Sequence, residues 1–328
     1  MHIKLGVNIA GIQMCNPIMI ASGVFGFGEN YVNIEGFSNN EIGAIILKGT
    51  TLHPREGNPP PRLVEVSKAC GIINSIGLQN PGIDTVLRNY LPKLRQYKTN
   101  IILNIGGTTE EEYEEIAKRI GDCFGVHGVE VNISCPNTKR GGAQFGADSA
   151  TSFNIIQKVK KSTPFPIIAK LSPNVTDIKP IVNACIEAGA NAISLINTVR
   201  AMSIDIKSKR PKLGANFGGL SGPAIKPIAL LKVYEAYQVA KEYNIPIIGI
   251  GGIQDAEDII EFILAGARAI QIGTSIMYYE QTIKDLIEDL ETKLKELKVY
   301  DINDLVGGVI LNKIPENLNN PRPKGLGI

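Results

Sequence analysis

The segment VEVNISCPNTKRGGAQFG, residues Val129–Gly146, joins a buried strand to a cluster of small polar groups. It begins with the β-branched apolar residues that are typical of a buried strand. It then breaks at Cys135 and Pro136, and closely spaced glycines follow, which a helix or a strand tolerates poorly. Because functional groups are often mounted at the end of a rigid strand, we interpret Cys135 as the catalytic residue.

Seven further β-rich runs recur along the chain, with helical patterns between them. Together with Val129–Ser134, the runs are Ile18–Gly23, Ala44–Lys48, Ile101–Gly107, Ile167–Ser172, Ala192–Thr198, Ile247–Gly252 and Ala269–Thr274. Continuous apolar runs favour a parallel sheet that is covered on both faces. Eight of them with helical crossovers predict an α/β fold, a closed (β/α)8 TIM barrel, in preference to an open doubly wound sheet.

Polar residues or glycines lie at the carboxyl end of nearly every run. In a barrel these ends surround one pocket, whereas in a two-domain fold they would have no reason to align. We therefore predict a single domain over residues 1–328. Two longer insertions, Gly49–Gly82 and Arg200–Gly222, are expected as loops at the C-terminal face of the barrel.

Three helices can be predicted from the sequence, two of them between the runs and one after the last run. Thr108 or Thr109 is expected to cap a helix over Glu110–Ile120, and Asp255 is expected to cap one over Ala256–Leu264, which Gly266 ends. A last long helix is predicted from one apolar stripe, formed by Ile283, Leu286, Ile287, Leu290, Leu294 and Leu297.

Composition excludes several classes of protein. A net charge of +2 without blocks of like charge does not favour nucleic acid or an anionic membrane as a partner. No apolar run approaches the roughly 18 residues of a membrane span, and no secretion signal is recognisable at the N-terminus. The five scattered cysteines include no CxxC pair, which argues against zinc, an iron–sulfur cluster or a disulfide framework. We expect a reducing, cytoplasmic compartment and no metal site.

The last two runs end in the dipeptides Gly251-Gly252 and Gly273-Thr274. Barrels commonly bind a phosphate there through backbone N–H groups, and Gly222 precedes another helix start. The alternative is that the glycines simply let strands turn, but the repeated pattern favours a ligand that bears a phosphate.

Lysines and asparagines also lie at strand ends. Lys48 and Lys170 each end an apolar strand and could hold a reduced flavin ring, bind a carboxylate or form a Schiff base. The carboxamides of Asn74, Asn104, Asn132 and Asn197 could recognise the edges of a planar, imide-like ligand.

A free cysteine is usually buried and inert, and this is the main alternative for Cys135. Here, however, the thiol lies in a polar cluster and is followed by a glycine-rich loop, which suits proton abstraction from a weak carbon acid. None of the three histidines lies near these motifs in sequence, so no Cys–His pair is expected.

The chain resembles the class 1 dihydroorotate dehydrogenases from about Ile3 to Tyr279. The matching motifs are ASGVFGFG (Ala21–Gly28), PREGNPPPR (Pro54–Arg62), NSIGLQNPG (Asn74–Gly82), NISCPN (Asn132–Asn137), GGLSGPAIKP (Gly218–Pro227), IPIIGIGGI (Ile245–Ile253) and AEDIIEFILAGA (Ala256–Ala267). Members of this family are flavin-bearing barrels that oxidise (S)-dihydroorotate to orotate in de novo pyrimidine biosynthesis.

The resemblance implies a role for each matching residue. Cys135 would take the C5 proton while the C6 hydride passes to N5 of the flavin mononucleotide FMN. The substrate would be held by Lys48, Asn74, Ser75, Ile76, Gly77, Leu78, Asn132, Asn197 and Thr198. The FMN would be bound by Ser22, Lys48, Gly49, Asn104, Asn132, Lys170, Ile196, Gly222, Gly251, Gly252, Gly273 and Thr274.

The segment KRGGAQFG and Gln79 resemble the NAD-linked class 1B more than the fumarate-linked class 1A. Class 1B pairs this subunit with a second one that carries FAD and a [2Fe–2S] cluster, as a heterotetramer around a homodimer. The chain itself shows no G-x-G-x-x-G nicotinamide fingerprint after a first strand. Two departures from the family pattern, Gly49 and Ala201, lie near the expected ligands, and neither removes a catalytic group.

Other functions remain open on the sequence alone. A fumarate-using class 1A enzyme or a flavoenzyme like dihydropyrimidine dehydrogenase would use the same barrel. A Schiff-base aldolase would use Lys170 as its nucleophile. A flavin- or metabolite-binding protein without catalysis is a further alternative, but it would have no need of a thiol in a polar pocket.

Overall fold

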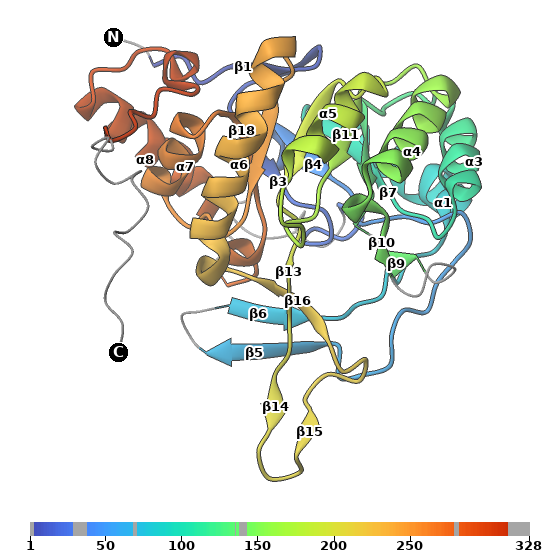
Figure 1. Ribbon diagram of the computed structural model, residues 1–328. Helices are drawn as coiled ribbons and strands as arrows, with labels where there is room; N and C mark the ends of the chain where they lie inside the picture. Colours follow the sequence, from blue (N-terminus) through green and yellow to red (C-terminus); the bar gives the residue numbers. More distant parts are fainter. Residues whose placement is uncertain are drawn as a thin grey trace, which may run out of the picture.

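The computed structural model describes residues 3–28, 38–67, 71–134, 136–137, 143–278 and 282–313, and its centre is a closed barrel of eight parallel strands (Figure 1). In barrel order the strands are β3 (Ile18–Ile20), β4 (Ala44–Ile46), β7 (Asn100–Ile105), β8 (Gly128–Asn132), β11 (Ile167–Lys170), β12 (Ala192–Leu195), β17 (Ile247–Ile250) and β18 (Ala267–Ile272). Strand β18 pairs with β3 and closes the ring. The predicted TIM barrel is therefore confirmed. Each observed strand ends two or three residues before the end of the run predicted for it from the sequence.

Helices surround the barrel on the outside (Figure 1). They are α1 (Ile83–Thr85), a π-helical turn (Val86–Tyr90) that continues into α2 (Leu91–Leu94), α3 (Glu110–Ile120), α4 (Ser149–Ser162), α5 (Lys179–Glu187), α6 (Lys226–Ala240), α7 (Ala256–Leu264) and α8 (Thr282–Glu296). Short 3-10 turns lie at Asn39–Glu41, Phe145–Ala147, Pro223–Ile225, Lys241–Tyr243, Thr274–Met277 and Ile302–Leu305. No helix among the described residues is both long and apolar enough to cross a membrane.

The expected helix caps are confirmed. The Thr109 hydroxyl accepts a hydrogen bond from the Glu112 amide at 3.2 Å, and Asp255 accepts one from the Asp258 amide at 2.9 Å. The predicted apolar stripe is wrong at one residue. Leu297 lies one position beyond the end of α8 and is 55% exposed. Its exposure follows from that position, because the helical periodicity no longer turns the side chain toward the core.

The two insertions form a sheet as well as loops. Strands β5 (Leu63–Ser67) and β6 (Gly71–Asn74) come from the first insertion, and β13 (Val199–Ala201) and β16 (Gly218–Ser221) lie at the two ends of the second. They pair in the antiparallel order β13-β16-β6-β5. A hairpin of β14 (Ile204–Asp205) and β15 (Arg210–Pro211) projects beyond this sheet (Figure 1).

A hairpin of β1 (Val7–Ile9) and β2 (Ile12–Met14) lies at the opposite pole. The Asn100 side chain at the start of β7 donates a hydrogen bond to the Gln13 carbonyl at 2.9 Å. The remaining strands are the two-residue pair β9 (Pro136–Asn137) and β10 (Ala143–Gln144). Hydrophobic residues of the barrel and of the inner helix faces form the core, and the C-terminal ends of the barrel strands are left for the site.

Candidate active site

A cavity of about 400 Å³ lies at the carboxyl ends of the barrel strands, bordered by β6 and β16 of the added sheet. This volume is typical of a cofactor pocket. Twelve of the residues predicted from the sequence line it: Ser22, Asn74, Ile76, Lys170, Ile196, Asn197, Thr198, Gly222, Gly251, Gly252, Gly273 and Thr274. Residues that are far apart in the sequence thus meet in one place, as the barrel topology requires.

One end of the cavity is built from glycines. Gly222, Gly251 and Gly252 have φ angles of +103°, +131° and +77°, which favour glycine over residues with a side chain. A Cβ atom on Gly252 would lie 2.9 Å from the Lys226 backbone nitrogen and 3.0 Å from the Gly222 carbonyl oxygen. Glycine at this position therefore keeps the backbone amides uncovered, as the binding of a phosphate requires.

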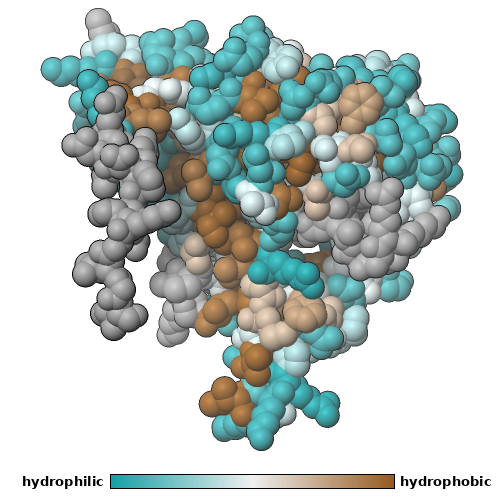
Figure 2. Space-filling view, in the orientation of Figure 1, coloured by the Kyte–Doolittle hydropathy of each residue, from teal (hydrophilic) through white to brown (hydrophobic). Residues whose placement is uncertain are grey.

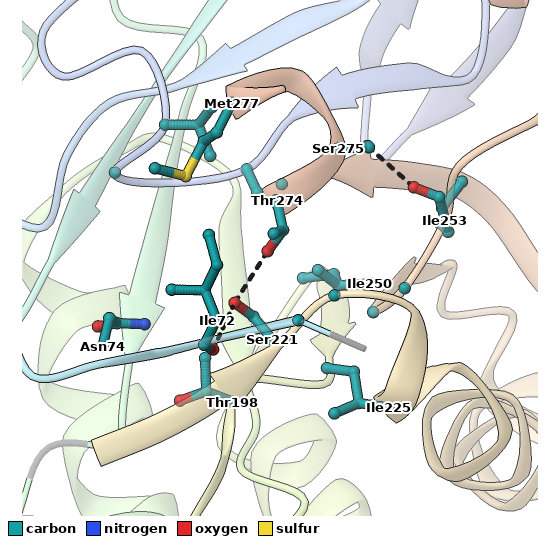
Figure 3. A pocket seen from close by; sticks show the side chains of 18 of the residues that line it. Ile72, Asn74, Thr198, Ser221, Ile225, Ile250, Ile253, Thr274, Ser275 and Met277 are labelled. Atoms are coloured by element: carbon teal, nitrogen blue, oxygen red, sulfur yellow. Dashed lines mark hydrogen bonds between the residues drawn. The ribbon is translucent and has the colours of Figure 1, made fainter. Parts of the chain in front are cut away.

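Hydroxyl groups complete this end of the cavity (Figure 3). The Thr274 hydroxyl donates a hydrogen bond to the Ser221 Oγ at 2.8 Å, and Ser275 donates one to the Ile253 carbonyl at 3.0 Å. A Cβ atom on Gly273 would meet only Ala21, at 3.6 Å. These hydroxyls donate to protein acceptors and fix the turn, so the residues fit a phosphate group by their backbone amides.

A buried polar network lies at the other end of the cavity, inside the barrel. The Glu130 carboxylate is fully buried and contacts the Lys170 Nζ at 3.2 Å. It also accepts hydrogen bonds from Asn104 at 2.7 Å, Ser194 at 2.9 Å and Gln271 at 2.6 Å. Lys170, which is 6% exposed, therefore has the anionic partner that a buried lysine needs.

Asn104 offers an acceptor to a ligand. Its Oδ1 atom is buried and has no hydrogen-bond partner among the described residues. A Cβ atom on Gly49 would lie 3.0 Å from this oxygen and 3.2 Å from Leu78, so glycine leaves the approach to it open. A buried unpaired acceptor is costly unless a ligand satisfies it, and an N–H group of a flavin ring would do so.

The residues before Cys135 form a second polar cluster. The Asn132 Oδ1 accepts hydrogen bonds from the Ser134 amide and the Asn197 Nδ2, each at 3.2 Å, and Asn197 also donates to the Ser134 hydroxyl. The buried Tyr113 hydroxyl donates to the Asn132 carbonyl at 2.7 Å. Cys135 itself lies outside the described residues, and this cluster fixes the chain immediately before it.

Lys48 is a half-buried cation that follows β4. Burial lowers the pKa of its ammonium below the ordinary value of 10.5, and repulsion from Arg62 lowers it further. The part of the chain that the structure describes shows no ion pair for it. Two cations near each other, neither of which forms an ion pair with a described residue, suit a ligand that bears a carboxylate.

The remaining predicted residues belong to the loop after β6. The Ser75 hydroxyl accepts a hydrogen bond from Asn58 at 2.8 Å, so its side chain is engaged within the loop. Gly77 and Leu78 have φ angles of +75° and +55°. The cavity reaches this loop at Asn74 and Ile76. Seven of the described residues predicted for the site are not in its lining, namely Ser75, Gly77, Leu78, Lys48, Gly49, Asn104 and Asn132.

His127 lies at the other pole, where β8 begins. Its Nδ1 accepts a hydrogen bond from the Ile101 amide at 3.0 Å, and burial lowers its pKa. This placement agrees with the expectation for His127, which was predicted to lie at the pole opposite the site.

Sequence reasoning missed three members of the buried network, namely Glu130, Ser194 and Gln271. A signal was present, because a single charged or amide side chain inside an apolar strand, as in VEV or AIQIG, needs a buried partner. The identity of that partner depends on which strands are neighbours.

Comparisons with known proteins agree on one family. Residues 4–294 match the family model described as dihydroorotate dehydrogenase. The chain is 49% identical over 311 residues to "Dihydroorotate dehydrogenase B (NAD(+)), catalytic subunit" of Desulforamulus reducens, covering 95% of this chain and 100% of that one. It is 46% identical to the protein of the same name from Desulforudis audaxviator, over 94% of this chain and 98% of that one.

A solved structure, that of DHODH from Eimeria tenella in complex with ferulenol, has a TM-score of 0.77 and 25% identity to this chain. The match covers 93% of this chain and 88% of the chain in that structure. The family model spans well over half of the chain, and the relatives are similar along their whole length. The chain belongs to the dihydroorotate dehydrogenase family.

Proposed function

We propose that this chain oxidises (S)-dihydroorotate to orotate in pyrimidine biosynthesis, as the FMN-containing catalytic subunit of an NAD-linked enzyme. The observation that carries the proposal is the cavity, which joins a glycine-built phosphate site to the Lys170 ammonium. The buried network behind Lys170 holds Asn104, whose amide oxygen is unpaired among the described residues. The relatives named as catalytic subunits of dihydroorotate dehydrogenase B support the NAD-linked class over the fumarate-linked one.

The described residues fit FMN. The FMN phosphate would be held by Gly222, Gly251, Gly252, Gly273 and Thr274, and the ring would be held by Ser22, Lys48, Gly49, Asn104, Asn132, Lys170 and Ile196. When bound, FMN supplies a hydride acceptor. The Schiff-base alternative is disfavoured, because the Lys170 Nζ is occupied by Glu130 and Gln271, at 3.2 and 3.3 Å.

The substrate would be oriented by charge and by amides. Lys48 would bind the substrate carboxylate, while Asn74, Asn132, Asn197 and Thr198 would hold the edges of the pyrimidine, supported by the loop Ser75–Leu78. The Cys135 thiolate would then take the proton from C5 as the hydride leaves C6. The cluster of Asn132, Ser134 and Asn197 keeps the segment before the thiol in place.

We further propose a partner subunit that carries FAD and a [2Fe–2S] cluster, in a cytoplasmic heterotetramer built around a homodimer of this chain. The words "catalytic subunit" in the names of the relatives support a second subunit. The projecting hairpin supports association as well, because it carries hydrophobic residues at its tip (Figure 2). There, Ile204 and Ile206 are 54% and 86% exposed.

Substrate and acceptor specificity test this function. The purified chain is expected to oxidise dihydroorotate, and not dihydrouracil, with an artificial electron acceptor. It should reduce NAD efficiently only when a subunit with FAD and a [2Fe–2S] cluster is added, and fumarate should not replace NAD. Efficient NAD reduction by the chain alone would refute the two-subunit proposal, and preference for dihydrouracil would refute the substrate.

The pH dependence of orotate binding tests Lys48. Its depressed pKa means that the ammonium loses its charge at a lower pH than an ordinary lysine. The affinity for orotate should therefore be highest below this pKa, where the ammonium is charged, and should fall as the pH rises through it. A charge-assisted hydrogen bond contributes about 1.5–3 kcal/mol, so Lys48→Met should weaken binding roughly 10- to 150-fold at neutral pH.

The matched control for this experiment is Lys48→Arg, which remains charged throughout. It should bind orotate with a flatter pH profile, measured by the change in FMN absorbance on titration. An unchanged profile in both variants would show that Lys48 does not bind the carboxylate.

A further inference from the structure

Glu130 is a buried acid that the proposed reaction does not use. It lies in the middle of β8, and its carboxylate contacts side chains from four other barrel strands: Asn104 of β7, Lys170 of β11, Ser194 of β12 and Gln271 of β18. All five residues are at most 6% exposed. Burying a carboxylate is expensive even with these partners, so its presence calls for a reason beyond packing.

The first consequence of this network is the orientation of Asn104. The Nδ2 of Asn104 donates to Glu130 at 2.7 Å, and a carboxylate can only accept, so the amide cannot flip without placing two acceptors together. Its Oδ1, buried and without a partner among the described residues, is therefore held as an acceptor on the other side, next to Gly49.

The second consequence concerns Lys170, which lines the cavity. Two of its three N–H groups point to Glu130 at 3.2 Å and to the Gln271 Oε1 at 3.3 Å. This geometry leaves one donor for the cavity and places a negative charge directly behind the positive one. Because the site is poorly hydrated, the nearby carboxylate of Glu130 weakens the positive electrostatic potential that the Lys170 ammonium exerts on a ligand.

We propose that Glu130 is a positioning residue that fixes Asn104 and Lys170 against the flavin ring, and that its charge limits how strongly Lys170 favours the reduced flavin. This inference rests on the proposed function. Glu130 touches neither flavin nor substrate in this account and acts only through its two neighbours.

The FMN reduction potential of Glu130→Gln tests the proposal. Glutamine is close in size and keeps one acceptor, but it removes the negative charge behind Lys170. Reduced FMN should then bind about tenfold more tightly relative to oxidised FMN, which corresponds to a rise of about 30 mV for a two-electron couple. Oxidised FMN should at the same time bind the apoprotein more weakly, since the amide of the new side chain can turn a donor toward Asn104.

Ser194→Ala is the matched control. It removes one hydrogen bond to the same carboxylate and leaves all charges in place. A purely structural role for Glu130 predicts that both variants lose thermal stability and that neither changes the potential. The proposal requires the potential of Glu130→Gln alone to rise, and equal potentials in the two variants would overturn it.

A second variant covers the case in which Glu130→Gln does not fold. The double variant Glu130→Gln/Lys170→Gln replaces the ion pair by a neutral pair. Its FMN potential should fall below that of the unmodified protein, because Lys170 lines the cavity and Glu130 lies behind it; an unchanged potential would refute the role of the charges. If the unmodified protein binds no FMN, the proposed function fails, whereas FMN binding and turnover with no shift in any variant refute only the role of Glu130.

Discussion

Cys135→Ala is expected to lower steady-state orotate formation by about 10²- to 10⁴-fold, the range typical for the loss of a general base. FMN should remain bound, because the predicted phosphate site at Gly222, Gly252 and Thr274 follows other strands of the fold. Turnover with an artificial acceptor measures the loss of orotate formation, and the flavin absorbance of the purified variant measures how much FMN stays bound.

Other thiols of the chain supply the controls for this experiment. Cys15 is exposed, and burial raises the pKa of the Cys185 thiol to about 12, so neither resembles a base in a polar pocket. Cys15→Ala and Cys185→Ala should keep full turnover. Cys135→Ser should be slow and should work best at high pH, because a hydroxyl is a far weaker acid than a thiol. Unchanged turnover of Cys135→Ala would refute its assignment as the base.

Gly252→Ala is expected to weaken FMN binding roughly 10- to 150-fold. The new Cβ would approach the Lys226 nitrogen and the Gly222 carbonyl to 2.9 and 3.0 Å, and this would displace the backbone around the phosphate site. Loss of one hydrogen bond to a charged group accounts for about 1.5–3 kcal/mol of binding. Titration of the apoprotein with FMN, followed by flavin fluorescence, measures the effect.

Gly11→Ala separates this loss from general backbone strain. Gly11 has a φ angle of +91°, close to the +77° of Gly252, but a Cβ on it would meet nothing within 4 Å. Both variants should lose some thermal stability, and only Gly252→Ala should lose FMN. Equal FMN affinity in the two variants would contradict the placement of the phosphate.

Local patterns in the sequence predicted the barrel, because parallel strands buried on both faces leave long apolar runs such as Ile247–Ile250. The caps at Thr109 and Asp255 were equally readable, since a cap depends on neighbours within three residues. The sheet of β5, β6, β13 and β16 was not predicted. Its central pairing, β6 with β16, joins segments separated by more than a hundred residues, and these two short strands carry glycines that are typical of loops.

The site was predicted in part for a similar reason. Residues at strand ends, such as Asn197 and Gly251, were identified because the barrel topology collects those ends around one pocket. Glu130 was missed because its role depends on which side chains face it inside the barrel, and spacing along the chain does not contain that information. The predicted catalytic role of Cys135 and the extent of the single domain remain predictions.

An anaerobic titration of the purified chain with dihydroorotate tests the central claim most directly. The account predicts a yellow protein whose FMN absorbance near the visible maximum bleaches stoichiometrically, with one orotate formed for each flavin. A protein that carries no flavin, or a flavin that stays oxidised in excess dihydroorotate, would contradict it.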